Sequence, residues 1–202
     1  MGKIFYIMGK SASGKDRIYS ILSKDESLGL KRLVLYTTRP IRAGEENGRE
    51  YYFTDENKLE EFRKTNRLIE SRAYHTVHGI WTYFTADDGQ INPQGTDYLG
   101  IGTLESYRKM KEYYGEETVC PIYIQVEDGE RLQRALIREK QQENPRYAEM
   151  CRRFLADQED FSEENILAAG IRIRFENDDL DNCVRNIICL LYTSPSPRDR
   201  SL

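Results

Sequence analysis

Residues 4–15 read IFYIMGKSASGK, an apolar run followed by a glycine-rich segment. The apolar run predicts a buried strand, and the segment after it predicts a tight turn into a helix at about 15–23. Gly9, Gly14 and Lys15 have the spacing of a phosphate-binding loop, in which backbone N–H groups surround an anion and the lysine reaches its outer phosphates. Strand, loop and helix in this order predict an α/β domain that binds a nucleotide.

The loop departs from the usual motif at one position. Asp16 stands where Ser or Thr normally supplies a hydroxyl ligand for Mg²⁺. A carboxylate beside a triphosphate needs a cation between the two, so we expect Asp16 to organise magnesium, directly or through water. Magnesium is the cofactor predicted for this chain, with ATP as the co-substrate. The residues assigned to ATP around this loop are Gly9, Ser11, Ala12, Ser13, Gly14, Lys15, Asp16 and Arg17.

The rest of the chain alternates between strand and helix patterns. Further buried strands are predicted at 33–36, 98–101, 122–126 and 171–175. Helices are predicted at about 104–113, 129–141, 148–161 and 179–188. Such alternation predicts a parallel sheet flanked by helices, with ligands at the carboxyl ends of the strands.

The domain organisation follows from one interruption of this pattern. Residues 39–94 carry shorter, tyrosine-rich strands and one charged helix at about 56–65, and we interpret them as an inserted lobe that binds the phosphate acceptor. The nucleotide-binding core then comprises residues 1–38 and 95–188, including a helical lid at about 130–160. Residues 189–202 resemble the translation of a sequencing adapter, and we expect them to be a non-native tail.

The start of this lobe has the residues needed to hold a phosphate monoester. Residues 37–53 read TTRPIRAGEENGREYYF. Arg39 and Arg42 each offer a planar fork of donors to phosphate oxygens, and Tyr51 or Tyr52 adds a hydroxyl. A charged surface loop is the alternative for a generic Arg-Gly-Glu segment.

The whole ordered string at 37–53, together with the phosphate-binding loop, resembles the guanylate kinase family. The resemblance implies transfer of the γ-phosphoryl group of ATP to GMP, giving ADP and GDP. It implies that Arg39, Arg42 and Tyr51 bind the GMP phosphate, that Glu45 supports them, and that Glu70 reads the guanine. Guanine presents two adjacent donors to a carboxylate, which only accepts, and adenine lacks that pair. The alternative for Glu70 is a solvated position at the end of a strand.

The resemblance also assigns residues to the transferring phosphoryl group. Lys15 and three lid arginines, Arg134, Arg138 and Arg153, would stabilise the charge that develops there. Ordinary salt bridges on the helix surfaces are the alternative for each arginine. Asn177 resembles the position that contacts the adenine of ATP, and a helix cap is its alternative.

Departures from the family pattern keep other functions open. Gly100 and Gly102 stand where guanylate kinases carry two aspartates, and the second tyrosine that holds the phosphate cannot be assigned among Trp81, Tyr83 and Phe84. A loop reading GKD without the downstream aspartates also resembles the ribose 1,5-bisphosphate kinases, which would change the acceptor. A third possibility is a catalytically silent module that binds a phosphorylated partner.

Composition limits the range of partners. The 202 residues carry a net charge of −4, so the chain has no overall basic field for nucleic acid or an anionic membrane. The four cysteines have no C-x-x-C spacing, which argues against a zinc site or a disulfide framework. The N-terminal apolar run is too short for a signal sequence. We therefore expect a cytoplasmic monomer or homodimer whose partners are small-molecule nucleotides.

Overall fold

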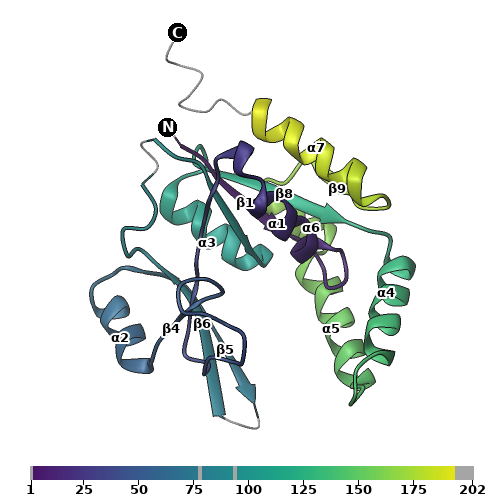
Figure 1. Cartoon of the computed structure of the whole chain (residues 1–202), viewed down its shortest axis with the longest axis horizontal. Coiled ribbons are helices and arrows are strands. Elements are labelled where there is room, and N and C mark those ends of the chain that lie inside the picture. The colour runs from purple at the N-terminus through teal and green to yellow at the C-terminus, as the bar shows by residue number, and fades with distance from the viewer. Residues whose placement is uncertain (1, 77–78, 93–94, 194–202) are drawn as a thin grey trace.

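The computed structural model describes residues 2–76, 79–92 and 95–193. Its core is a parallel sheet with the strand order β2-β7-β1-β8-β9, of which β1, β8 and β9 are labelled in Figure 1. The strands are β1 (Ile4–Met8), β2 (Lys31–Arg32), β7 (Tyr98–Gly102), β8 (Val119–Gln125) and β9 (Arg174–Glu176). Because β1 is the central strand, the glycine-rich loop begins at the middle of the sheet's carboxyl edge. The predicted α/β fold with a parallel sheet is confirmed.

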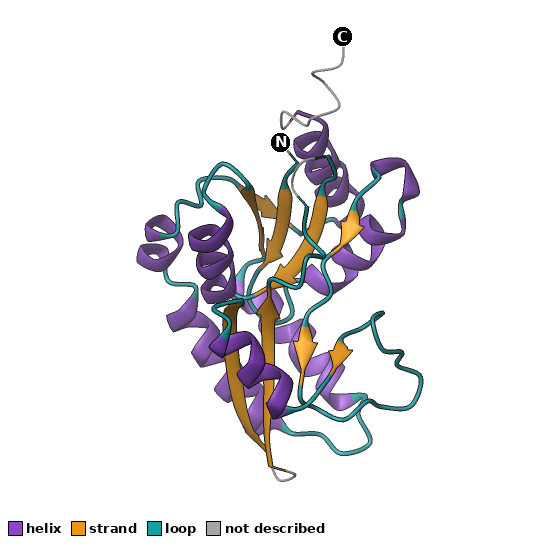
Figure 2. Ribbon diagram, turned by 90° about the vertical axis from the view of Figure 1, so that its left-hand side faces the viewer, coloured by secondary structure: helices purple, strands orange, loops and turns teal. Residues whose placement is uncertain are grey.

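Helices cover both faces of the sheet (Figure 2). They are α1 (Lys15–Lys24), η1 (Glu26–Leu28), α3 (Leu104–Tyr114), α4 (Asp128–Lys140), α5 (Tyr147–Asp160), α6 (Glu163–Ala168) and α7 (Leu180–Thr193). Alternate residues of β1 point to opposite faces, so Tyr6 packs with α3 and α6 while Ile7 packs with α1 and α7. Helices α4 and α5 occupy the segment predicted to be the lid. No helix in the described part of the chain is long and apolar enough to cross a membrane.

A second sheet forms the inserted lobe, on the opposite side of Figure 1 from α4 and α5. Its strands are β3 (Tyr36–Thr37), β4 (Tyr52–Phe53), β5 (Leu68–Thr76) and β6 (Gly79–Ala86), in the order β4-β3-β6-β5, and α2 (Glu56–Lys64) packs beside them. The prediction of short strands here is wrong for β5 and β6, which have 9 and 8 residues. These two strands pair with each other as one long antiparallel hairpin, so they extend beyond the two-residue strands β3 and β4 of the same sheet.

The prediction of a strand at 33–36 is wrong, because most of this segment connects the two sheets. The chain passes between the two sheets here, because β2 ends at Arg32 in the core and β3 begins at Tyr36 in the lobe. Between them, the Gln90 side chain donates to the Val34 carbonyl and accepts from the Val34 amide, at 3.1 and 3.0 Å. A side chain thus takes the hydrogen bonds that a neighbouring strand would otherwise provide. The buried Leu33 explains why the segment resembles a strand in sequence.

Two other predicted boundaries change towards the C-terminus. The strand predicted at 171–175 is reduced to β9, because the Ile171 amide donates to the Ile166 carbonyl and so finishes the turn after α6. Helix α7 continues beyond the predicted end at 188, through Thr193, and buries Leu191 against the sheet. The part of the predicted tail at 194–202 lies outside the described residues.

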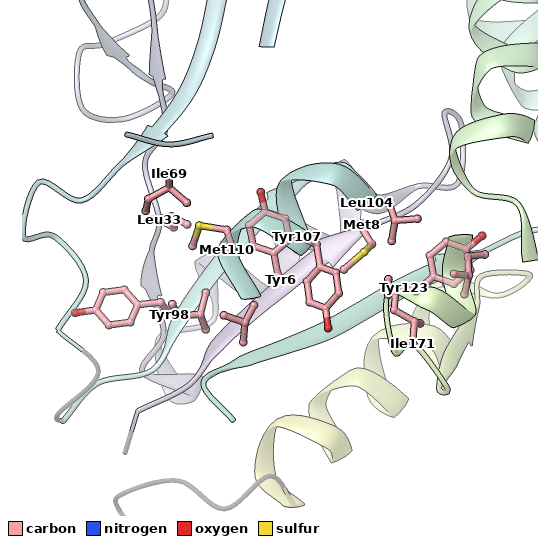
Figure 3. Packing of buried hydrophobic residues seen from close by; sticks show 14 of the residues in the cluster. Tyr6, Met8, Leu33, Ile69, Tyr98, Leu104, Tyr107, Met110, Tyr123 and Ile171 are labelled. Carbon is pink, nitrogen blue, oxygen red and sulfur yellow. The ribbon is translucent and has the colours of Figure 1, made fainter. Parts of the chain in front are cut away.

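Tyr6 explains the glycines at 100 and 102. It is fully buried on β1, beside Tyr107 of α3 (Figure 3), and its register partner on β7 is Gly100. A Cβ atom on Gly100 would lie 2.8 Å from the Tyr6 ring, and one on Gly102 would overlap the Tyr6 hydroxyl and lie 2.5 Å from Ser106 Oγ. The tyrosine ring therefore occupies the space that side chains at 100 and 102 would need.

We expect Gly102→Ala to lower the free energy of unfolding by about 1–3 kcal/mol, because the new methyl group overpacks a site that Tyr6 already fills. Gly95→Ala is the matched control, since a Cβ atom there would meet nothing within 4 Å. Urea denaturation followed by circular dichroism measures both. Equal stability of the two variants would contradict the packing seen around Tyr6.

Candidate active site

The backbone of the phosphate-binding loop lies very close to neighbouring residues at two of its glycines, Gly9 and Gly14. Gly14 is the N-cap of α1 with φ of 86°, a left-handed conformation that favours glycine, and a Cβ atom there would overlap the Asn177 side chain. A Cβ atom on Gly9 would lie 2.6 Å from the Ile124 carbonyl oxygen of β8. Ala12 also has a positive φ, of 63°, and such strain is common where a backbone is shaped around a ligand. The loop backbone is therefore fixed by its neighbours in the sheet.

Asn177 supports the loop from the carboxyl end of β9. Its Nδ2 donates to the Ser13 carbonyl at 2.7 Å, and its own carbonyl accepts from Arg134 Nη2 at 3.1 Å. Ala12, Gly14, Arg17, Arg134 and Asn177 line one cavity of about 360 Å³. The structure thus groups Arg134 with the loop and Asn177, away from the other two lid arginines.

Arg138 and Arg153 face a second cavity, of about 180 Å³, between α4 and α5. Ser11 of the loop borders the same cavity, and Arg153 Nη2 lies 3.2 Å from Ser11 Oγ. Two of the three predicted lid arginines therefore converge on the start of the phosphate-binding loop.

A buried arginine that the sequence analysis did not single out ties the lid to the loop. Arg131 of α4 is 1% exposed, and its guanidinium donates to the Ser11 carbonyl at 3.1 Å. The same group pairs with Asp128 at 2.6 Å and Asp157 at 3.4 Å. Asp157 of α5 in turn accepts from the Ser11 amide at 2.7 Å. The Asp157 carboxylate of α5 thus accepts the hydrogen bond of the Ser11 backbone amide in the loop.

Lys10 adds a second connection from the loop to the lid. Its ammonium group lies 3.3 Å from Asp128 and also donates to Gln158 of α5. Burial alone would raise the pKa of Asp128, but hydrogen bonds from Gln158 and Arg131 outweigh it and hold that pKa below its usual range. The loop and both lid helices therefore share one network of charges.

Lys15 and Asp16 begin α1 at the open end of the loop. Lys15 Nζ lies 3.6 Å from the Asp16 carboxylate, whose side chain is 85% exposed. Burial raises the pKa of the Tyr51 hydroxyl above its ordinary value, and the negative charge of Asp16 adds to that rise. Asp16 therefore lies close enough to the inserted lobe for its charge to act on Tyr51.

Arg39 organises the lobe's arginine-rich turn. Its side chain is 3% exposed and forms a bidentate ion pair with Glu45, at 2.8 and 3.0 Å. Its Nε donates to the Tyr83 hydroxyl at 3.2 Å, and this places Tyr83, among the three aromatic residues left open, beside the predicted phosphate site. The hydrogen bonds that Arg39 donates to Glu45 raise the pKa of Arg39 above its ordinary value. The supporting contact of Glu45 is thus to Arg39.

The other predicted phosphate ligands remain accessible. Arg42 is exposed, and its side chain forms no hydrogen bond or ion pair among the described residues. Tyr51 is half-buried and packs edge-on against Tyr83, with ring centroids 5.4 Å apart. Arg42, Tyr51 and Tyr83 therefore supply one cation and two hydroxyl groups in one part of the lobe.

Glu70 is buried, which does not fit the alternative of a solvated strand end. It is 7% exposed on β5, where Thr85 Oγ1 donates to one carboxylate oxygen at 2.9 Å and Arg72 Nε to the other at 3.2 Å. Arg72 also donates to Thr103 Oγ1 at 3.1 Å, at the N-cap of α3. Arg72 and Thr103 line a cavity of about 620 Å³ that α5 and α6 also border.

Known proteins that resemble this chain share one family. The family model described as guanylate kinase matches residues 1–191 of the chain. The chain belongs to the guanylate kinase family. The predicted family and the predicted enzyme class, an ATP-dependent nucleoside monophosphate kinase, are confirmed.

Individual guanylate kinases resemble the chain to different extents. The one from Porphyromonas gingivalis is 29% identical over 190 residues, covering 93% of this chain and 95% of that protein. The one from Lactobacillus johnsonii is 36% identical over 77 residues, only 38% of either chain. The crystal structure of guanylate kinase from Anaplasma phagocytophilum superposes with a TM-score of 0.60 at 20% identity, covering 95% of this chain and 85% of that one, and shows the shared fold.

We expect Asn177→Asp to weaken ATP binding about tenfold or more, because a carboxylate oxygen would face the Ser13 carbonyl in place of a donor. Isothermal titration calorimetry with ATP measures the dissociation constant. Asn182→Asp, an exposed position on α7, carries the same charge change and should leave ATP binding unaltered. Equal affinities in the two variants would contradict a role for Asn177 in shaping the loop.

Proposed function

We propose that this guanylate kinase homologue transfers the γ-phosphoryl group of ATP to the phosphate of GMP, giving ADP and GDP. The observation that carries the proposal is the burial of Glu70 between two hydrogen-bond donors, in the lobe that also presents Arg42, Tyr51 and Tyr83. A carboxylate fixed in this way accepts from the two adjacent donors of guanine and finds no such pair on adenine. The acceptor site therefore matches both ends of GMP.

The residues that would hold ATP lie on the core. Backbone N–H groups of the glycine-rich loop and Lys15 surround the phosphates, and Asn177 supports the loop near the expected adenine position. Arg138 and Arg153, beside Ser11, are the groups best placed to stabilise charge on the transferring phosphoryl. Arg134 would act at the nucleotide cavity that it shares with Asn177.

The residues that would hold GMP lie on the lobe. Arg42 and the hydroxyls of Tyr51 and Tyr83 contact the phosphate directly in this proposal, while Arg39 and Glu45 form the buried pair that shapes the turn. No covalent intermediate is required, because positioning and charge neutralisation are sufficient for phosphoryl transfer. The burial of Arg39 and the exposure of Arg42 support this division between a supporting role and direct contact.

Magnesium would be held mainly by the nucleotide phosphates and by Asp16. Tyr6 fills the space beside Gly100 and Gly102, so a carboxylate cannot be supplied from there, whereas Asp16 is exposed at the open end of the loop. A hard cation that keeps several waters needs no more than one such protein ligand. When bound, the ion neutralises charge on the phosphates. A cytoplasmic location and a monomeric or homodimeric state, without nucleic acid or membrane partners, stay predictions from the sequence.

The acceptor assignment is tested by ADP release from the full chain with ATP and magnesium, coupled to NADH oxidation, with GMP, AMP or ribose 1,5-bisphosphate as the acceptor. We expect release with GMP, and at least about 100-fold lower kcat/KM with AMP, because adenine leaves the Glu70 carboxylate without its donors. Release only with the sugar bisphosphate would replace the proposal, and release with none would favour a silent binding module.

Asp16→Asn tests the metal assignment. We expect about tenfold or more loss of kcat/KM and a higher magnesium concentration for half-maximal turnover, because the amide is a weaker ligand for a hard cation. Asp181→Asn, exposed on α7, is the matched control and should retain both values. If turnover of Asp16→Asn keeps the wild-type magnesium dependence, Asp16 does not organise the ion.

A further inference from the structure

Arg72 stands between the base-reading carboxylate and the cavity beside it. Its side chain is 18% exposed and lines the cavity of about 620 Å³, whereas the Glu70 side chain beneath it is 4% exposed. Arg72 is held from two sides, by Glu70 at 3.2 Å and Thr103 at 3.1 Å. A ligand that enters the cavity and approaches Glu70 therefore meets the Arg72 guanidinium as well.

The hydrogen-bond donors beside Glu70 are not equally available. Thr85 carries one hydroxyl proton, which it already donates to Glu70, and Thr85 is 1% exposed. Arg72 has five N–H groups, of which Nε and Nη1 bind Glu70 and Thr103, and its Nη2 makes no hydrogen bond to any described residue. Arg72 is thus the donor beside Glu70 that has capacity left for a ligand.

The hydrogen bonds around Thr103 fix where Arg72 lies. Thr103 caps α3 in a reciprocal capping box with Ser106, and the buried Tyr6 hydroxyl donates to Ser106 Oγ at 2.9 Å. Burial lowers the pKa of Arg72, but the charge of Glu70 and its hydrogen bond, together with the nearby hydroxyls of Tyr74 and Tyr6, outweigh that effect and leave the pKa above its ordinary value. Arg72 is therefore a charged donor, anchored through Thr103 to the nucleotide-binding core.

On the assumption that GMP is the acceptor, we propose that Arg72 is a second specificity-determining residue, which donates to the 6-oxo group of guanine while Glu70 accepts from N1–H and the 2-amino group. These groups are neighbours on one edge of the base, so a donor for the oxo group must lie directly beside the carboxylate, where Arg72 Nε and Nη2 are. The ion pair presents an acceptor on Glu70 next to a donor on Arg72. This arrangement matches the donors and the oxo acceptor of guanine, whereas adenine has a donor at position 6 and an acceptor at N1.

The test compares three acceptors on Arg72→Met and the wild-type full chain. GMP carries both base features, and IMP lacks the 2-amino group. The riboside monophosphate of 2-aminopurine lacks the 6-oxo group and, with it, the N1 proton. Loss of the N1–H donor to Glu70 affects the wild type and Arg72→Met alike, so the difference between the two proteins reports the contact of Arg72 with the oxo group. We expect Arg72→Met to reduce the preference in kcat/KM for GMP over the 2-aminopurine analogue by about 10- to 100-fold, the cost of one charge-assisted hydrogen bond. Its preference for GMP over IMP should change little, whereas Glu70→Gln should reduce that preference.

Two controls separate base recognition from support of the fold. Arg108→Met removes a charge from the same cavity, where Arg108 Nη2 donates to the Asn165 carbonyl at 2.7 Å, and should leave the GMP to 2-aminopurine ratio unchanged. The Glu70→Gln, Arg72→Met double variant, compared with Glu70→Gln alone, repeats the test without a buried unpaired carboxylate. ATP affinity by calorimetry verifies that each variant is folded.

Failure of this inference is distinct from failure of the proposed function. If the wild type phosphorylates GMP and Arg72→Met keeps the full preference over the 2-aminopurine analogue, the inference is overturned and the function stands. A rise in kcat/KM for GMP in Arg72→Met would also overturn it, because Arg72 would then obstruct the base. If the wild type phosphorylates none of the purine monophosphates, the function fails and the inference fails with it.

Discussion

The close contact between Tyr6 and the backbone of β7 is the constraint on which much of the site depends. Because the tyrosine ring fills the space beside Gly100 and Gly102, this edge of the sheet supplies no carboxylate, and the Tyr6 hydroxyl instead anchors Ser106. Ser106 and Thr103 then define the start of α3, where Arg72 of the lobe docks. One buried side chain on the central strand thereby connects the phosphate-binding core to the ion pair of Glu70 and Arg72.

The lid is connected to the core in a different way. Arg131 and Asp157 bind the carbonyl and the amide of Ser11, so the position of α4 and α5 depends on the glycine-rich loop. Asp128 and Asp157 both pair with Arg131, so the charges that join α4 and α5 to the core are grouped around Ser11.

Several parts of this architecture could be predicted from short segments. The glycine spacing from Gly9 to Gly14 requires specific backbone geometry, and the string at 37–53 combines arginines and tyrosines that a generic loop does not need. The apolar segment at 33–36 led to the wrong prediction of a strand. Leu33 is buried as a strand residue would be, but the hydrogen-bond partner of Val34 is the side chain of Gln90. Nothing local to Val34 indicates a partner so distant in the sequence.

The sequence by itself determined the order of strand, loop and helix, the residue types that the loop and the lobe present, and the family, because each depends on residues that are close together in the chain. Only the tertiary structure decided which charges meet. Arg131 resembles any other arginine on a helix, and Arg72 any charged residue on a strand, until the fold buries one against Ser11 and sets the other between Glu70 and Thr103. The physical reason is that burial and pairing depend on contacts between residues far apart in sequence, which no local pattern contains.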